Sequence, residues 1–172
     1  TISVVLTPGI VALGVGFIVL LLLATHQLVE RMQRDARGID LAVGAKGSPM
    51  QIILSAIYHI DVPTGNITWK EAQEISRHRM VKKAIPLALG DSYRGHRIVG
   101  TTPAYFEHYG AALAAGRIWQ APMEAVIGAE VAARTRFGIG AEFHGVHGLG
   151  DGGGHAHENH PYRVVGVLAR SG

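Results

Sequence analysis

Histidines gather in one short segment of this 172-residue chain. Imidazole nitrogen is a good ligand for zinc, copper and nickel, and three or four rings on one pliable loop can close a tetrahedral site. The segment 144–160 therefore predicts a site for Zn²⁺ or another divalent ion, which Asp151 or Glu158 could complete. The candidate ligands are five of the ten histidines of the chain: His144, His147, His155, His157 and His160.

Two other interpretations of this segment stay open. A His-rich tract is a compositional signal, so a solvated loop that joins two strands without any ion also fits. The run His155-Ala-His157-Glu-Asn-His160 resembles the H-x-H-x-D-H zinc motif of metallo-β-lactamase-fold hydrolases. Asn159 stands where that motif has aspartate, and the 12 residues that follow lack the further ligands of those hydrolases. The glycines add an entropic cost to ordering the loop, which favours exchangeable binding.

Several kinds of chemistry are excluded by what the sequence lacks. Cysteine is absent, which excludes disulfides, thiolate zinc sites and a cysteine nucleophile. No G-x-x-x-x-G-K-[ST] signature for a phosphate-binding loop occurs. The run Gly90-Asp-Ser-Tyr-Arg-Gly95 misses the G-x-S-x-G nucleophile motif by one residue and is better read as a polar hairpin turn. The net charge of +3 is small, so no nucleic-acid partner is expected. We predict that the chain has no catalytic residues and is not an enzyme.

The N-terminal segment has the length and composition of a membrane span. Residues 2–24 carry no charge, and the first charged residue is Glu30. Twenty-three residues make roughly 34 Å of helix, enough for a hydrocarbon core of about 30 Å. A cleaved signal peptide is the alternative, but the run is longer than its apolar region and no A-x-A site follows. We expect a transmembrane helix with a stalk over residues 1–37, ended by Gly38.

The remaining residues, 38–172, are expected to form one α+β domain outside the membrane. Thr68 and Glu71 have the spacing of a capping box, which predicts a helix start at Trp69. Apolar periodicity predicts helices over 50–60, 69–78, 103–109 and 129–137. Alternating or β-rich runs predict strands over 39–43, 81–85, 87–93, 96–101, 124–128, 141–145 and 162–168.

Several motifs occur in a recognisable order after the apolar helix. They are Gly38-Ile-Asp-Leu-Ala-Val-Gly-Ala-Lys-Gly-Ser-Pro49, Arg97-Ile-Val-Gly-Thr-Thr-Pro-Ala-Tyr-Phe106, Ala115-Gly-Arg-Ile-Trp119, Glu124-Ala-Val-Ile-Gly-Ala-Glu-Val-Ala132 and Tyr162-Arg-Val-Val-Gly-Val-Leu168. Together they resemble the first membrane helix and periplasmic core domain of MacB/FtsX-type ABC transporter permeases. The resemblance covers essentially the whole chain and implies that the chain is a fragment, without three of the membrane helices and part of the outer domain.

The resemblance implies a membrane assembly. Permeases of this family have four membrane helices, with a large extracytoplasmic domain after the first. They work as dimers with a cytoplasmic P-loop ATPase, and many relay ATP-driven motion to the outer domain. The chain is accordingly expected in the bacterial cytoplasmic (inner) membrane, with residues 38–172 outside it. Its expected partners are that ATPase, a second permease copy, membrane lipid and a periplasmic protein.

The histidine segment departs from the family pattern. In the family a short hairpin usually joins the two strands that flank it. An insertion at a hairpin tip costs the fold little, so the segment could be a metal site added to the scaffold. Two alternatives to a permease remain: a single-span membrane-anchored metal-binding or sensor protein, and a membrane-tethered metallohydrolase.

Overall fold

The computed structural model describes residues 2–60, 62–147 and 160–170. The chain divides into two compact units, Thr1–Ala42 and Val43–Gly172. The predicted boundary between residues 37 and 38 stays a prediction.

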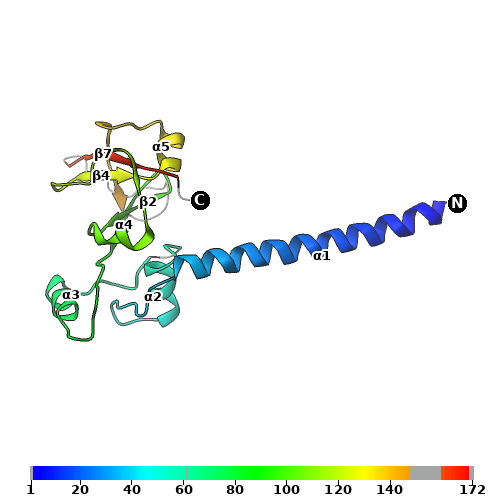
Figure 1. Ribbon diagram of the computed structural model, residues 1–172, viewed down its shortest axis with the longest axis horizontal. Coiled ribbons are helices and arrows are strands. Elements are labelled where there is room, and N and C mark those ends of the chain that lie inside the picture. Colours follow the sequence, from blue (N-terminus) through cyan, green and yellow to red (C-terminus); the bar gives the residue numbers. More distant parts are fainter. Residues whose placement is uncertain (1, 61, 148–159, 171–172) are drawn as a thin grey trace. The chain divides into compact units, whose positions relative to one another are not determined.

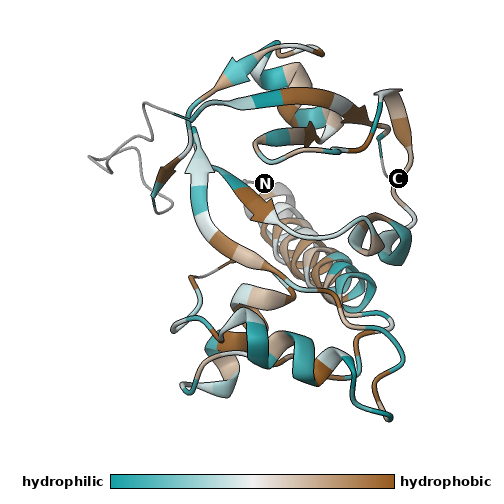
Figure 2. Ribbon diagram, turned by 90° about the vertical axis from the view of Figure 1, so that its left-hand side faces the viewer, coloured by the Kyte–Doolittle hydropathy of each residue, from teal (hydrophilic) through white to brown (hydrophobic). Residues whose placement is uncertain are grey.

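The first unit is one long helix, α1 (Ile2–Asp35), which contains Pro8 in its interior (Figure 1). Its apolar side chains from Leu6 to Leu23 are exposed, and its polar residues gather toward the C-terminal end (Figure 2). Among the described residues it is the one helix long and apolar enough to cross a membrane. The helix gives way to a turn that ends at Gly38, whose φ of 74° is left-handed.

The second unit begins with two short helices, α2 (Pro49–Ala56) and α3 (Trp69–Ser76). The predicted capping box at the start of α3 is confirmed. The Glu71 N–H donates to Thr68 Oγ1 at 3.2 Å, and the Thr68 N–H donates to Glu71 Oε2 at 2.8 Å. Both helices lie on the same side of the sheets in Figures 1 and 2.

One sheet has the strand order β2-β1-β6, all antiparallel. Strands β1 (Ala88–Tyr93) and β2 (His96–Gly100) form the predicted hairpin. Its two-residue turn has positive φ at Arg94 and Gly95, as the twist of a tight hairpin favours. Strand β6 (Val146–His147) pairs with the other edge of β1.

The other sheet is mixed and is built around β7 (Tyr162–Leu168). Strands β3 (Leu113–Gly116) and β5 (Glu142–Phe143) pair with β7 antiparallel, and β4 (Glu124–Ile127) pairs with it in parallel. Helix α4 (Ala104–Tyr109) precedes β3, and α5 (Ala129–Thr135) follows β4. The α+β class expected for this domain is confirmed.

The core of the second unit is small and lies at the centre of the mixed sheet. Val164 of β7 has no exposed surface, and Ile127 and Phe143 pack with it. Partly buried side chains from the hairpin and from α5 surround these three. The core therefore joins the two sheets.

Two predicted strands are wrong. Residues 39–43 and 81–85 form no ladder. The Val81 N–H instead donates to the His78 carbonyl at 2.9 Å and closes a turn. Residues 39–43 alternate as a strand would, but no strand in the described part of the chain pairs with them. Leu41 is accordingly exposed rather than packed in a sheet.

Candidate functional site at the foot of the histidine loop

The clearest polar contact near the histidine segment joins His147 to Asp91. The two residues lie opposite each other in the register between β6 and β1. The Nδ1 atom of His147 lies 2.8 Å from Asp91 Oδ1, and the Asp91 side chain is only 19% exposed. The shielded carboxylate fixes the orientation of the imidazole ring at the C-terminal end of β6.

Asp91 also reaches the strand on which the loop returns. The Tyr162 hydroxyl donates to Asp91 Oδ2 across 3.5 Å. Burial raises the pKa of Tyr162, and the negative charge of Asp91 and this hydrogen bond raise it further. The ring of Tyr162 stacks on Phe143 with a centroid distance of 5.4 Å. One carboxylate on β1, the middle strand of the hairpin sheet, therefore connects β6, which ends at His147, with β7, which begins at Tyr162.

The structure describes three of the five predicted histidine ligands, namely His144, His147 and His160. His144 and His160 are described and exposed, at the two sides of the loop. His155 and His157 lie outside the described residues, as do Asp151 and Glu158. Within residues 2–60, 62–147 and 160–170, no group of three or more metal-binding side chains is assembled. The predicted metal site therefore stays a prediction.

Sequence reasoning missed Asp91 as a member of the site. The strand pattern did indicate on which face Asp91 lies, because Asp91 and Tyr93 alternate with Ser92 and must share one face of the predicted strand. What the sequence did not show is that a two-residue strand, β6, pairs with β1 and places His147 beside that face.

The Asp91–His147 pair is suited to orienting a ligand. Metal-binding histidines commonly donate their second ring nitrogen to a carboxylate, which fixes the tautomer and the ring orientation. With Nδ1 held by Asp91, any metal ion would have to bind His147 through Nε2.

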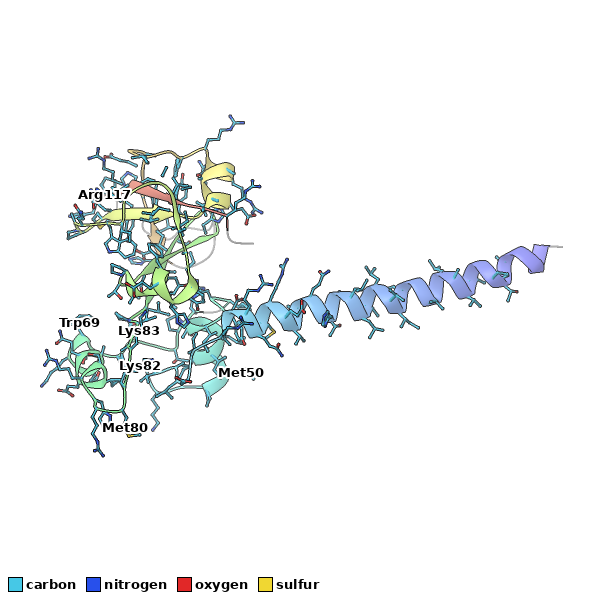
Figure 3. All side chains as sticks on the ribbon, in the orientation of Figure 1. Met50, Trp69, Met80, Lys82, Lys83 and Arg117 are labelled. Carbon is cyan, nitrogen blue, oxygen red and sulfur yellow. The ribbon has the colours of Figure 1, made fainter. Side chains whose placement is uncertain are left out.

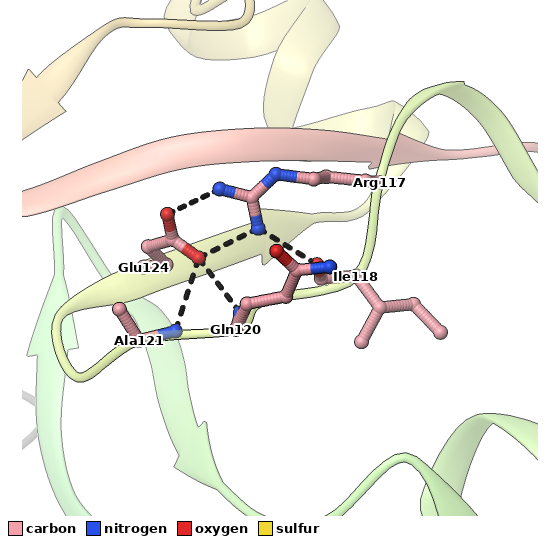
Figure 4. A network of polar contacts seen from close by, with 5 residues as sticks. All are labelled: Arg117, Ile118, Gln120, Ala121 and Glu124. Atoms are coloured by element: carbon pink, nitrogen blue, oxygen red, sulfur yellow. Dashed lines mark hydrogen bonds and ion pairs between the residues drawn. The ribbon is translucent and has the colours of Figure 1, made fainter.

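A second polar network explains the motif Ala115-Gly-Arg-Ile-Trp119. Figure 4 shows the Arg117 guanidinium on the carboxylate of Glu124, with Nη1 at 2.7 Å from Oε2 and Nη2 on Oε1. The backbone N–H groups of Gln120 and Ala121 donate to the same carboxylate, at 2.7 Å and 3.2 Å. Arg117 also donates to the Ile118 carbonyl at 3.0 Å. The network closes the loop between β3 and β4, so these two motif residues have a structural role.

This network predicts a pH dependence of stability. The hydrogen bond from Arg117 lowers the pKa of Glu124 to about 2, with help from the Gln120 N–H, against 4.5 for an ordinary carboxyl. Because the folded-state pKa is depressed, the stabilisation is present above pH 4.5 and is lost as the pH falls toward 2. Thermal unfolding should show wild type more stable than Glu124→Gln near neutral pH, with a gap that closes across that window. The control is Glu130→Gln, which breaks an exposed ion pair with Arg134. If the stability difference between wild type and this control closed equally over the same pH window, the pH dependence could not be assigned to Glu124.

These sites lie in a chain that consists of a long apolar helix followed by a two-sheet α+β domain. Comparisons with known proteins place this chain in a family. A family model described as the MacB-like periplasmic core domain matches residues 4–172. The chain belongs to this family, which confirms the resemblance seen in its motifs. None of the curated proteins compared with the chain matches it.

A similarity was also found among solved structures. The extracellular domain of the noncanonic ABC-type transporter YknZ from Gram-positive bacteria is 15% identical over 61% of this chain, with a TM-score of 0.42. The chain spans 58% of the length of that structure.

Proposed function

We propose that this chain is the membrane anchor and extracytoplasmic domain of an ABC transporter permease. The observation that carries the proposal is the extent of the family match, which begins inside α1 and continues through β7. The apolar helix and the sheet domain therefore belong to one family unit. The span-like composition of α1 supports the anchoring role.

The proposed mechanism is mechanical rather than catalytic. Helix α1 runs without a break from its apolar part to Asp35, so residues 25–35 extend it by about 16 Å beyond the apolar run. Motion driven by ATP in a separate cytoplasmic subunit would pass along this helix to the domain outside the bacterial cytoplasmic membrane. Two permease copies would move together, and the domain would meet its cargo or a periplasmic partner protein there.

The pairing with an ATPase can be tested directly. We expect the complete permease to copurify in detergent with a P-loop ATPase expressed beside it, and the complex to hydrolyse ATP. A complete permease that binds no such ATPase, or that hydrolyses ATP alone at the same rate, would contradict the proposal.

We propose in addition that the histidine loop binds a divalent metal ion, for which zinc is the first candidate. The specific observation in favour is the shielded carboxylate of Asp91 on Nδ1 of His147. This arrangement holds one candidate ligand in a fixed orientation at the foot of the loop. The ion would link the domain to a metal, or to a partner that carries one.

A zinc titration by calorimetry on the chain in detergent tests this second proposal. We expect a dissociation constant of about 1 µM or below, and no binding in the triple variant His155→Ala, His157→Ala, His160→Ala. Asp91→Asn should weaken binding roughly 10- to 100-fold, since it removes the partner that orients His147. His26→Ala, which changes a histidine of α1, should bind like wild type. Absence of zinc binding in wild type would contradict this proposal and favour the alternative interpretation, a solvated loop without an ion.

A further inference from the structure

The turn that follows α3 presents an apolar side chain at its tip. Met80 is 81% exposed, the largest exposed fraction among the large apolar side chains in the described part of the chain. The turn is fixed locally, because the Val81 N–H donates to the His78 carbonyl at 2.9 Å. Figure 3 shows Met80 projecting beyond α3 at the margin of the second unit.

Positive charge surrounds this tip. The seven residues from Arg77 to Lys83 contain four Lys or Arg and no acidic residue, so their charge of +4 exceeds the +3 of the whole chain. Lys83 pairs with Glu107 of α4 at 3.2 Å, which attaches the base of the turn to the domain. Arg77, Arg79 and Lys82 are exposed and form no ion pair with any residue that the structure describes.

We propose that the turn Arg77–Lys83 docks on the surface of an anionic lipid bilayer. Met80 enters the boundary between headgroups and acyl chains, while Arg77, Arg79 and Lys82 contact lipid phosphates. An apolar side chain flanked by cations is the composition that binds such interfaces, and anionic lipid attracts each nearby Lys or Arg. The inference rests on the proposed anchoring of the chain by α1.

The dimensions of the turn favour a lipid surface over a protein partner. A stable protein interface takes about 800 Å² and 20–30 residues from each side, whereas this feature is one exposed apolar side chain on a seven-residue turn. A weak lipid contact is sufficient here, because a membrane anchor on the same chain keeps the turn at a high local concentration near headgroups.

Fluorescence quenching by lipid tests the docking. Because the chain has no cysteine, Met80→Cys gives a single site for a bimane label. The labelled chain is reconstituted into vesicles of phosphatidylcholine with brominated acyl chains, with or without about 30 mol% phosphatidylglycerol. We expect roughly twofold quenching in the anionic vesicles, little in the neutral ones, and loss of the difference at about 0.5 M salt.

Two controls test whether the quenching depends on the charges of this turn and on the position of the label. Arg77→Gln, Arg79→Gln and Lys82→Gln together should abolish the quenching, whereas Arg134→Gln, Arg136→Gln and Arg170→Gln together remove the same charge elsewhere and should leave it. A label at Arg134→Cys on α5 should remain unquenched. Absence of quenching in anionic vesicles, or equal quenching in neutral ones, would overturn the docking.

Flotation with the vesicles measures the membrane anchoring of the chain separately from the docking of the turn. A chain that floats with neutral vesicles but shows no quenching at position 80 would leave the anchor standing and refute the docking. A chain that floats with neither vesicle would refute the anchor. If docking fails while the triple glutamine variant at the turn still impairs the permease in cells, an acidic protein is the occupant instead.

Discussion

Replacing Gly116 with alanine is expected to lower the free energy of unfolding of the sheet domain by about 3 kcal/mol or more. Gly116 ends β3 with a φ of 77°, which is strained for any residue with a side chain. A Cβ atom built there would overlap the Val165 carbonyl and would lie 2.9 Å from the Gly166 Cα. Both are backbone atoms of the central strand β7, so neither can move aside cheaply.

Thermal unfolding of Gly116→Ala and of a control variant measures this loss of stability. Gly116→Ala should lose about 10 °C in Tm, or fail to accumulate as a folded protein. Gly90→Ala is the matched control, because Gly90 also lies in a strand but a Cβ atom there meets nothing within 4 Å. Similar Tm values for Gly116→Ala and wild type would mean that β3 and β7 do not approach so closely.

A proline at position 29 is expected to abolish the relay of motion along α1. Val29 lies in the polar part of the helix beyond the apolar run and is 44% exposed, so its side chain is not needed for packing in the unit described. Proline there removes a helical hydrogen bond, clashes with the preceding turn and costs about 3 kcal/mol, which kinks or breaks the helix. The proposed mechanism requires a stiff helix at this point.

Spin labels on the two permease copies would report this relay. Glu142→Cys is exposed on β5 and supplies one label per copy in a chain without other cysteines. ATP should shift the distance between the labels with valine or alanine at position 29, and the shift should vanish with proline. ATP hydrolysis should meanwhile stay within about twofold, since the break lies outside the ATPase. A shift that survives Val29→Pro would show that motion reaches the domain by another route.

Local sequence signals predicted the elements that depend on local contacts. The capping box of Thr68 and Glu71 predicted the start of α3, and the strand patterns of residues 87–93 and 96–101 predicted β1 and β2. These features need only neighbouring residues, so a short pattern is sufficient. Two of the five motifs that carried the family resemblance, those around Gly116 and Gly166, pair with each other in β3 and β7.

Elements that depend on distant partners were missed or misplaced. Strand β3 has the sequence Leu-Ala-Ala-Gly, whose residues have little preference for strands, and it exists because β7 pairs with it. Strand β6 is too short to be recognised, and with it the approach of His147 to Asp91 was missed. Conversely, residues 39–43 have a strand pattern but no partner strand in the described part of the chain.

Accessibility of single cysteines in intact cells is the most direct test of the anchored, extracytoplasmic arrangement. A membrane-impermeant maleimide should label Glu142→Cys in the sheet domain without permeabilisation, because that residue is exposed. Leu20→Cys, in the apolar part of α1, should stay unlabelled in intact membranes. Labelling of Glu142→Cys only after the membrane is opened would place the domain in the cytoplasm and contradict the proposed function.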